Sequence, residues 1–132
     1  MKKIPVLLSA LFLSFLVNAQ SSIIVSPQWL NENLKDPDIV VLYTGFVIKA
    51  DYDREHIEGS RLLWPEWLAH NTPEANMVPA DVKKATKVLQ DLGINKNSKV
   101  VICHRGADVT IAARMFLSME HYGLKGQVFF LN

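Results

Sequence analysis

The sequence has 132 residues, of which 49% are hydrophobic and 20% are charged, with 14 Lys and Arg against 13 Asp and Glu. That length allows one domain, and the apolar content excludes a disordered chain. The nearly neutral charge balance argues against a nucleic-acid-binding protein, which needs a strongly cationic face to displace counterions from phosphates.

Residues 1–19 have the pattern of a secretory signal peptide. Lys2 and Lys3 form a basic start, Val6–Val17 is an apolar run, and small residues precede a cleavage position near Ala19. An apolar run this short does not span a hydrocarbon core of about 30 Å as a permanent helix. We therefore expect an exported protein, periplasmic or secreted, with no membrane attachment after cleavage.

The mature chain, residues 20–132, begins with a predicted helix and a predicted buried strand. Ser26 and Pro27 suit the N-cap and the first position of a helix that ends near Lys35. Residues 39–43 are a continuous apolar run rich in β-branched side chains, which predicts a strand buried on both faces. The following stretch is assigned to short elements: turns at 52–59, a strand at 61–64 and a helix at 65–70.

The second half of the chain alternates amphipathic helices with apolar strands. Residues 79–92 carry apolar side chains at helical spacing, and Gly93 ends this predicted helix. Residues 100–102 and 128–131 are predicted as strands, with a second amphipathic helix at 108–122 between them. Because parallel strands need crossover connections, this alternation predicts an α/β fold with a mainly parallel central sheet and helices on both faces.

Cys103 is the only cysteine, and it occurs where a predicted strand leads through a glycine-containing loop into a helix. Ligands of open α/β sheets bind beyond the carboxyl ends of the strands, and the N–H groups at a helix start attract anions. These surroundings favour the nucleophilic thiolate, and the adjacent His104 and Arg105 would strengthen the effect. Gly106 lets the loop curl around an anion. The residues thus indicate thiol chemistry on an anionic ligand.

The loop Cys103-His-Arg-Gly106, which follows an apolar strand, resembles the active-site loop of the rhodanese sulfurtransferases. Further stretches that resemble the family's connections and last strand are 52–60, 76–79, 92–94 and 129–132. The resemblance covers about residues 24–132, implies a rhodanese-like fold, and is strongest to the N-terminal domain of tandem thiosulfate sulfurtransferases. Because the family's chain continues with Gly-Gly and a further helix, we expect the domain to be incomplete at its C-terminus. A further rhodanese domain is accordingly an expected partner.

The resemblance also implies an activity. Cys103 would accept a sulfane sulfur from a donor such as thiosulfate, become a persulfide, and pass the sulfur to cyanide or a thiol. The basic His104 and Arg105 resemble the branch of the family that uses thiosulfate. By the same resemblance, the substrate-binding loop consists of His104, Arg105, Gly106, Ala107, Asp108 and Val109. No cofactor or metal is expected, because the histidines form no close ligand pair and a single cysteine gives no zinc-binding spacing.

Two other functions must be compared with sulfur transfer. Phosphatases of the cysteine-loop type use Cys-x5-Arg, but here Val109 takes the arginine's place, so the guanidinium that neutralises phosphoryl charge is missing. A non-catalytic rhodanese-like domain that packs against a catalytic domain or binds a partner is the remaining alternative. In its favour, residues 43–45 replace the family's Asp-x-Arg, and Glu55 and Glu58 replace its Gly and Pro. The presence of Cys103 favours catalysis.

Overall fold

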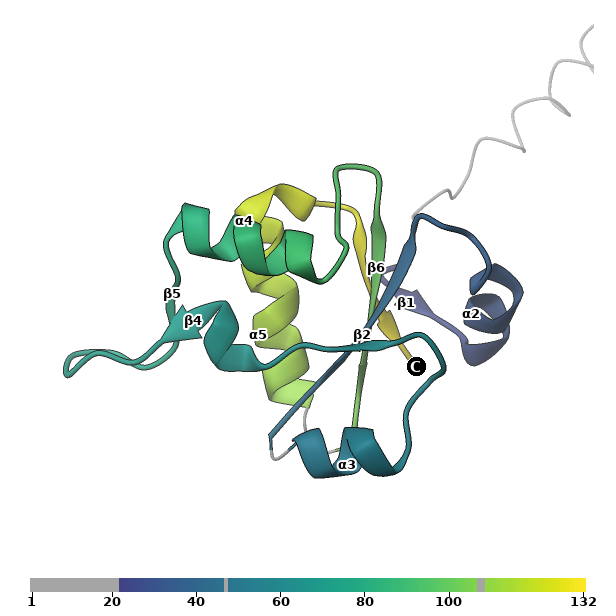
Figure 1. Ribbon diagram of the computed structural model, residues 1–132, viewed down its shortest axis with the longest axis horizontal. Coiled ribbons are helices and arrows are strands. Elements are labelled where there is room, and N and C mark those ends of the chain that lie inside the picture. The colour runs from purple at the N-terminus through teal and green to yellow at the C-terminus, as the bar shows by residue number, and fades with distance from the viewer. Residues whose placement is uncertain (1–21, 47, 107–108) are drawn as a thin grey trace, which may run out of the picture.

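The computed structural model describes residues 22–46, 48–106 and 109–132, so the predicted signal peptide at 1–19 lies outside the described residues. A parallel sheet of five strands forms the centre, in the order β1-β7-β6-β2-β3 (Figure 1). Its strands are β1 (Ile24–Val25), β2 (Ile39–Thr44), β3 (Arg61–Leu62), β6 (Lys99–His104) and β7 (Val128–Leu131). A separate antiparallel pair consists of β4 (Ala69–His70) and β5 (Val78–Pro79).

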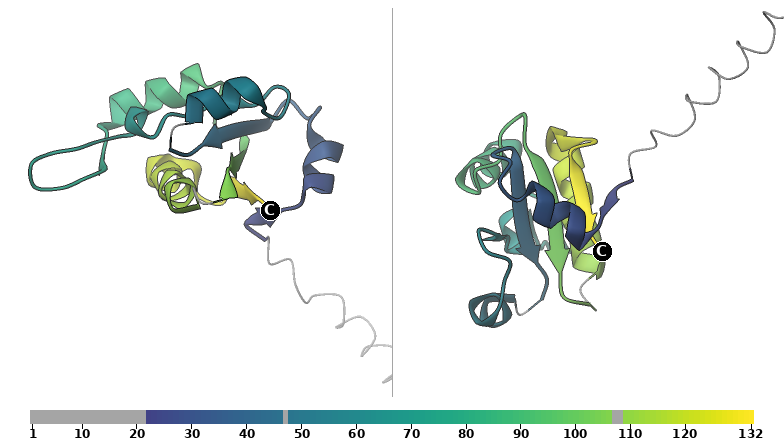
Figure 2. Two further views of the ribbon diagram at one scale, coloured as in Figure 1. Left: turned by 90° about the horizontal axis from the view of Figure 1, so that it is seen from below. Right: turned by 90° about the vertical axis from the view of Figure 1, so that its right-hand side faces the viewer.

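Helices cover both faces of this sheet, which confirms the predicted α/β architecture. In the described part of the chain the α-helices are α2 (Pro27–Asn33), α3 (Ile48–Arg54), α4 (Val82–Asp91) and α5 (Val109–Met119), with a 3-10 turn η2 (Pro65–Trp67) and a π turn η4 (Glu120–Leu124). Helices α4 and α5 lie on one side of the sheet and α2 on the other, while α3 lies at the carboxyl ends of the strands (Figures 1 and 2). Within the described ranges, no helix has the length and apolar character needed to cross a membrane.

The core has two apolar layers because successive side chains of a strand point to opposite faces of the sheet. On one face, Leu42 and Ile102 pack with Met115 of α5. On the other face, Val101 and Cys103 pack with residues that include Leu30 of α2. Cys103 therefore points to the α2 side of the sheet, away from α5.

Local capping explains where the predicted helices begin. The Ser26 hydroxyl accepts a hydrogen bond from the Trp29 N–H at 3.1 Å, as predicted for the N-cap of α2. The predicted helix at 79–92 begins later, because Asp81 caps it by accepting from the Lys84 N–H at 3.0 Å. Gly93 follows this helix with φ of +71°, a conformation that favours glycine.

The structure corrects three predictions of local structure. The predicted turns at 52–59 are wrong at their start, because α3 continues to Arg54 and an i,i+4 ion pair between Lys49 and Asp53 supports it. The predicted helix at 65–70 is only the short turn η2, followed by β4. The strand predicted to end before Cys103 continues to His104, because pairing with β2 extends to that residue.

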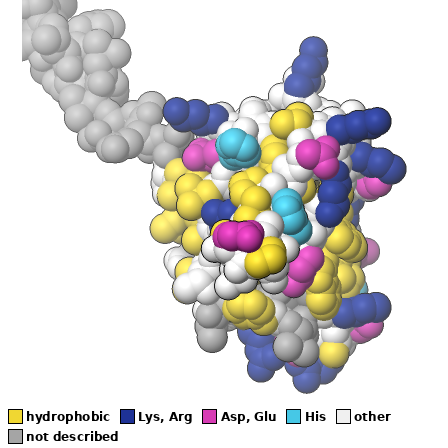
Figure 3. Space-filling view, turned by 90° about the vertical axis from the view of Figure 1, so that its left-hand side faces the viewer, with side chains coloured by type: hydrophobic (Ala, Val, Ile, Leu, Met, Phe, Trp, Pro, Cys, Tyr) yellow, Lys and Arg dark blue, Asp and Glu magenta, His cyan; other side chains and the backbone are white. Residues whose placement is uncertain are grey.

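The surface mixes both signs of charge, in keeping with the nearly neutral composition. The face that carries the β4–β5 pair shows hydrophobic side chains among basic and acidic ones (Figure 3).

Candidate active site

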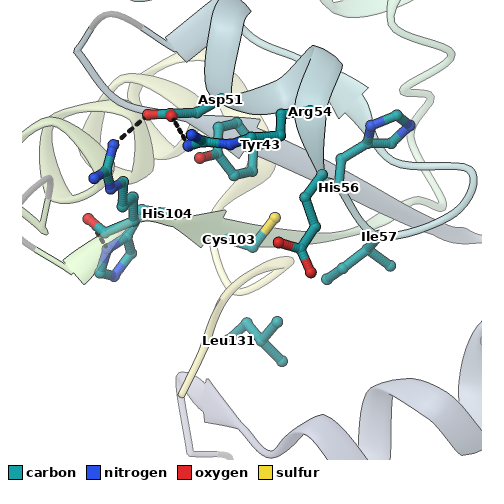
Figure 4. Close-up of a pocket in the computed structure, with 10 residues that line it drawn as sticks. Tyr43, Asp51, Arg54, His56, Ile57, Cys103, His104 and Leu131 are labelled. Carbon is teal, nitrogen blue, oxygen red and sulfur yellow. Dashed lines mark hydrogen bonds and ion pairs between the residues drawn. The ribbon is translucent and has the colours of Figure 1, made fainter.

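A pocket of about 490 Å³ lies at the carboxyl ends of the strands, next to α3 (Figure 4). This is the position at which open parallel sheets bind ligands. Strands β2, β6 and β7 contribute to it, together with α3 and the residues that follow that helix. Its lining residues are Tyr43, Asp51, Arg54, Glu55, His56, Ile57, Cys103, His104, Arg105 and Leu131.

Cys103 is on the wall of this pocket but is only 7% exposed. Its Sγ lies 3.4 Å from the Leu42 carbonyl oxygen, to which the thiol donates. Burial raises the pKa of the Cys103 thiol to about 11, because an apolar environment disfavours the charged thiolate. The expectation of a stabilised thiolate is therefore wrong for this structure. The physical reason is that Cys103 still belongs to β6 and, two residues after Val101, points with it into the same apolar layer.

Arg105 and Arg54 meet at the carboxylate of Asp51. The Arg105 Nη1 donates to Asp51 Oδ2 at 2.5 Å, and the Arg54 Nη2 donates to the other carboxylate oxygen, Oδ1. The Asp51 side chain is 18% exposed, whereas those of Arg54 and Arg105 are 71% and 67% exposed. One partly buried carboxylate thus holds two guanidinium groups at the rim of the pocket.

The two histidines of the pocket are held differently. His56 Nδ1 lies 2.6 Å from the Tyr52 carbonyl oxygen, and the His56 ring stacks on the Tyr52 ring at a centroid distance of 4.0 Å. His104 Nδ1 lies 3.4 Å from the carbonyl oxygen of the adjacent Arg105. Both histidines line the pocket, but Figure 4 shows their rings turned away from the Cys103 sulfur. His104 is the next residue after Cys103 in β6, so its side chain points to the opposite face of the sheet.

The structure brings together only part of the predicted substrate-binding loop. His104 and Arg105 are among the residues that line the Cys103 pocket, and His104 also lines a second pocket, described below. Gly106 has a φ outside the left-handed region and open space at its Cβ position, so the described backbone does not require glycine there. Val109 begins α5 and lines a separate pocket of about 370 Å³, on the side of the sheet away from Cys103. Ala107 and Asp108 lie outside the described residues.

The contribution of α3 to the pocket was not predicted from the sequence. Asp51, Arg54 and Glu55 reach the pocket from this helix and the residue after it, a segment predicted in part as turns. The i,i+3 and i,i+4 spacing of these charged side chains is the signal for one helical face. Tyr43, which the sequence showed only as a departure from the family pattern, also lines the pocket. Its ring packs against that of Tyr52, with the ring centroids 5.8 Å apart.

Comparison with known proteins identifies the family. Residues 26–132 match the model of the rhodanese-like domain. The chain belongs to this family. Among solved structures, SseA from Escherichia coli, described with the "Rhodanese" fold of the 3-mercaptopyruvate sulfotransferases, is similar over 85% of this chain, with a TM-score of 0.66 and 22% sequence identity. The chain spans 46% of the length of SseA, and the likeness shows a shared fold. No curated protein matches the sequence.

Proposed function

We propose that this rhodanese-like domain is a sulfurtransferase in which Cys103 carries a sulfane sulfur as a persulfide. The observation that supports this most strongly is the place of Cys103 in the wall of a pocket that Arg54 and Arg105 also line. A nucleophilic side chain and guanidinium groups in one pocket suit a reaction between a thiol and a sulfur-containing oxyanion.

Thiosulfate is the proposed donor. The Cys103 sulfur attacks the outer sulfur of thiosulfate, the S–S bond of the donor breaks, and sulfite leaves with the electron pair. The thiol proton passes to a base in the pocket, for which we propose Glu55, one of the lining residues. Cyanide or a thiol then attacks the outer sulfur of the persulfide. The S–S bond of the persulfide breaks, and the Cys103 sulfur leaves as a thiolate that is reprotonated before the next cycle.

The raised pKa of Cys103 makes proton removal part of this reaction. With a pKa of about 11, on the order of one molecule in ten thousand carries the thiolate at pH 7. A pocket base that accepts the proton as the sulfur attacks would avoid a free thiolate in an apolar layer. The domain should therefore transfer sulfur faster as the pH rises above neutrality.

Formation of thiocyanate from thiosulfate and cyanide tests the proposal. Wild type should produce thiocyanate, and Cys103→Ser should lose the activity while keeping its fold, because serine nearly conserves the side-chain volume. Equal rates for the two proteins would contradict the assignment. The same assay with 3-mercaptopyruvate tests the donor, and faster use of that compound would overturn thiosulfate while leaving Cys103 as the sulfur carrier.

A second candidate function is a non-catalytic domain that packs against a catalytic domain or binds a partner. The specific observations in its favour are the burial of Cys103 with its pKa of about 11, and the pairing of Arg105 with Asp51. This function predicts a folded protein that neither forms thiocyanate nor gains sulfur from any donor.

We also propose that the chain is exported. Three features of residues 1–19 support this proposal: the basic start, the apolar run, and the small residues that end at Ala19, after which cleavage would occur.

A further inference from the structure

We propose that Arg54 is a donor-binding residue that works with Arg105, and that Asp51 holds the two guanidinium groups together as one site for a sulfonate-type oxyanion. This inference rests on the proposed sulfur transfer and names how the donor is recognised. It adds a residue of α3 to a binding site that the sequence assigned only to the loop after Cys103.

The carboxylate of Asp51 pairs with arginines from two segments that are far apart in the sequence. Arg54 lies one helical turn after Asp51 in α3, whereas Arg105 follows β6. Figure 4 shows Asp51 between its two interactions, with Arg54 on the side of Tyr43. Because Asp51 is only 18% exposed and its partners are about 70% exposed, the carboxylate is the fixed part and the guanidinium groups face the pocket and solvent.

The net charge of the pocket does not by itself explain anion binding. Glu55 also lines it, so two arginines face two carboxylates, with His56 and His104 nearby. Recognition must therefore come from the planar donor geometry of guanidinium, which matches the oxygens of an oxyanion in a way that a lysine ammonium does not. A guanidinium carries five N–H donors, and the Arg54 contact with Asp51 involves its Nη2. The remaining N–H groups of Arg54 suit a sulfonate.

Donor binding and sulfur transfer then take place in neighbouring parts of the pocket. The sulfonate oxygens bind at Arg54 and Arg105, and the outer sulfur of the donor extends toward Cys103. When the S–S bond breaks, the sulfite that leaves remains on the same guanidinium groups, which stabilise the negative charge as it gathers on the leaving group. Sulfite is consequently expected to inhibit the reaction by competing with thiosulfate.

Three variants test the role of Arg54. Arg54→Ala removes the guanidinium, and Arg54→Lys keeps the charge but removes the planar donors. Lys49→Ala is the matched control, because Lys49 lies on the same helix, pairs with Asp53 and does not line the pocket. We expect Arg54→Ala to raise the KM for thiosulfate about 10-fold, the effect of losing one charge-assisted hydrogen-bonding partner. We expect Arg54→Lys to recover only part of this loss and Lys49→Ala to behave like wild type.

A second sulfur donor distinguishes a role of Arg54 in binding thiosulfate from a role in maintaining the fold. Cysteamine persulfide has no sulfonate or carboxylate, so Arg54→Ala should load Cys103 from it at the wild-type rate, as measured by intact mass. A thiosulfate KM unchanged by Arg54→Ala would overturn the inference, and so would an equal loss in Lys49→Ala or an equal loss with both donors.

A binding measurement keeps this test independent of catalysis. In the Cys103→Ser background, calorimetry should show thiosulfate binding that weakens about 10-fold when Arg54→Ala is added. Equal affinity in the two proteins would overturn the role of Arg54 even in an active enzyme. Weaker binding in a protein that loads no sulfur from either donor would support the oxyanion site and overturn the proposed sulfur transfer.

Discussion

Alkylation of Cys103 by iodoacetamide should be slow at neutral pH and should accelerate about tenfold for each pH unit up to about pH 10. The pKa of about 11 means that on the order of 0.1% of the thiol is ionised at pH 8. An exposed cysteine with a pKa of about 8.5 is ionised to roughly one quarter at that pH. The thiolate of higher pKa is intrinsically more nucleophilic by about tenfold, which offsets part of this difference. Cys103 should therefore react at least about 10-fold more slowly than an exposed cysteine at pH 8.

A matched reference makes this measurement decisive. The double variant Cys103→Ser with Lys84→Cys places the only thiol on the exposed side of α4, in the same fold. Mass spectrometry of both proteins over pH 6–10 gives the two rate profiles. A plateau for Cys103 below pH 9, or rates equal to those of the reference thiol at pH 8, would refute the argument from burial.

The remaining predictions concern stability and processing. Because the pKa of Cys103 rises from its ordinary value of 9.0 to about 11 on folding, its stabilising contribution is complete below pH 9 and is lost as the pH rises to 11, by about 3 kcal/mol. Urea unfolding should show this loss in wild type relative to Cys103→Ser, and parallel pH profiles of the two proteins would contradict it. Thr44→Val should destabilise the fold by about 1–3 kcal/mol, because the fully buried Thr44 hydroxyl donates to the Leu63 carbonyl at 3.0 Å and that acceptor would be left unpaired. An unfolding free energy within about 0.5 kcal/mol of wild type would count against this role. The exported protein should begin near Gln20, and N-terminal sequencing that finds Met1 would show the signal-peptide interpretation to be wrong.

The fold was predictable where apolar side chains form an unbroken run or follow helical spacing. Residues 39–43 are such a run, residues 79–92 have such a spacing, and both segments form the predicted kind of element. Helix α3 was missed because its residues are mostly polar and ion pairs such as Lys49–Asp53 support it, so apolar periodicity gives no signal. The end of β6 was misplaced because it depends on pairing between His104 and Thr44, which only the register of the two strands determines.

The candidate site was predictable only in the segment that contains Cys103. Cys103, His104 and Arg105 are adjacent in the sequence and share one pocket. The contact between Arg105 and Asp51 joins residues of two separate segments, and no local pattern predicts such a contact. The protonation state of Cys103 was also beyond local reasoning, because the desolvation that raises its pKa comes from the packing of several elements.

Intact mass of the protein after incubation with thiosulfate tests the central proposal most directly. Wild type should gain about one sulfur atom, cyanide should remove it, and Cys103→Ser should gain none. The yield of the adduct should rise with pH, because burial holds the pKa of Cys103 at about 11. A folded wild-type protein that gains no sulfur at any pH, or a Cys103→Ser protein that gains as much as wild type, would contradict sulfur transfer through Cys103.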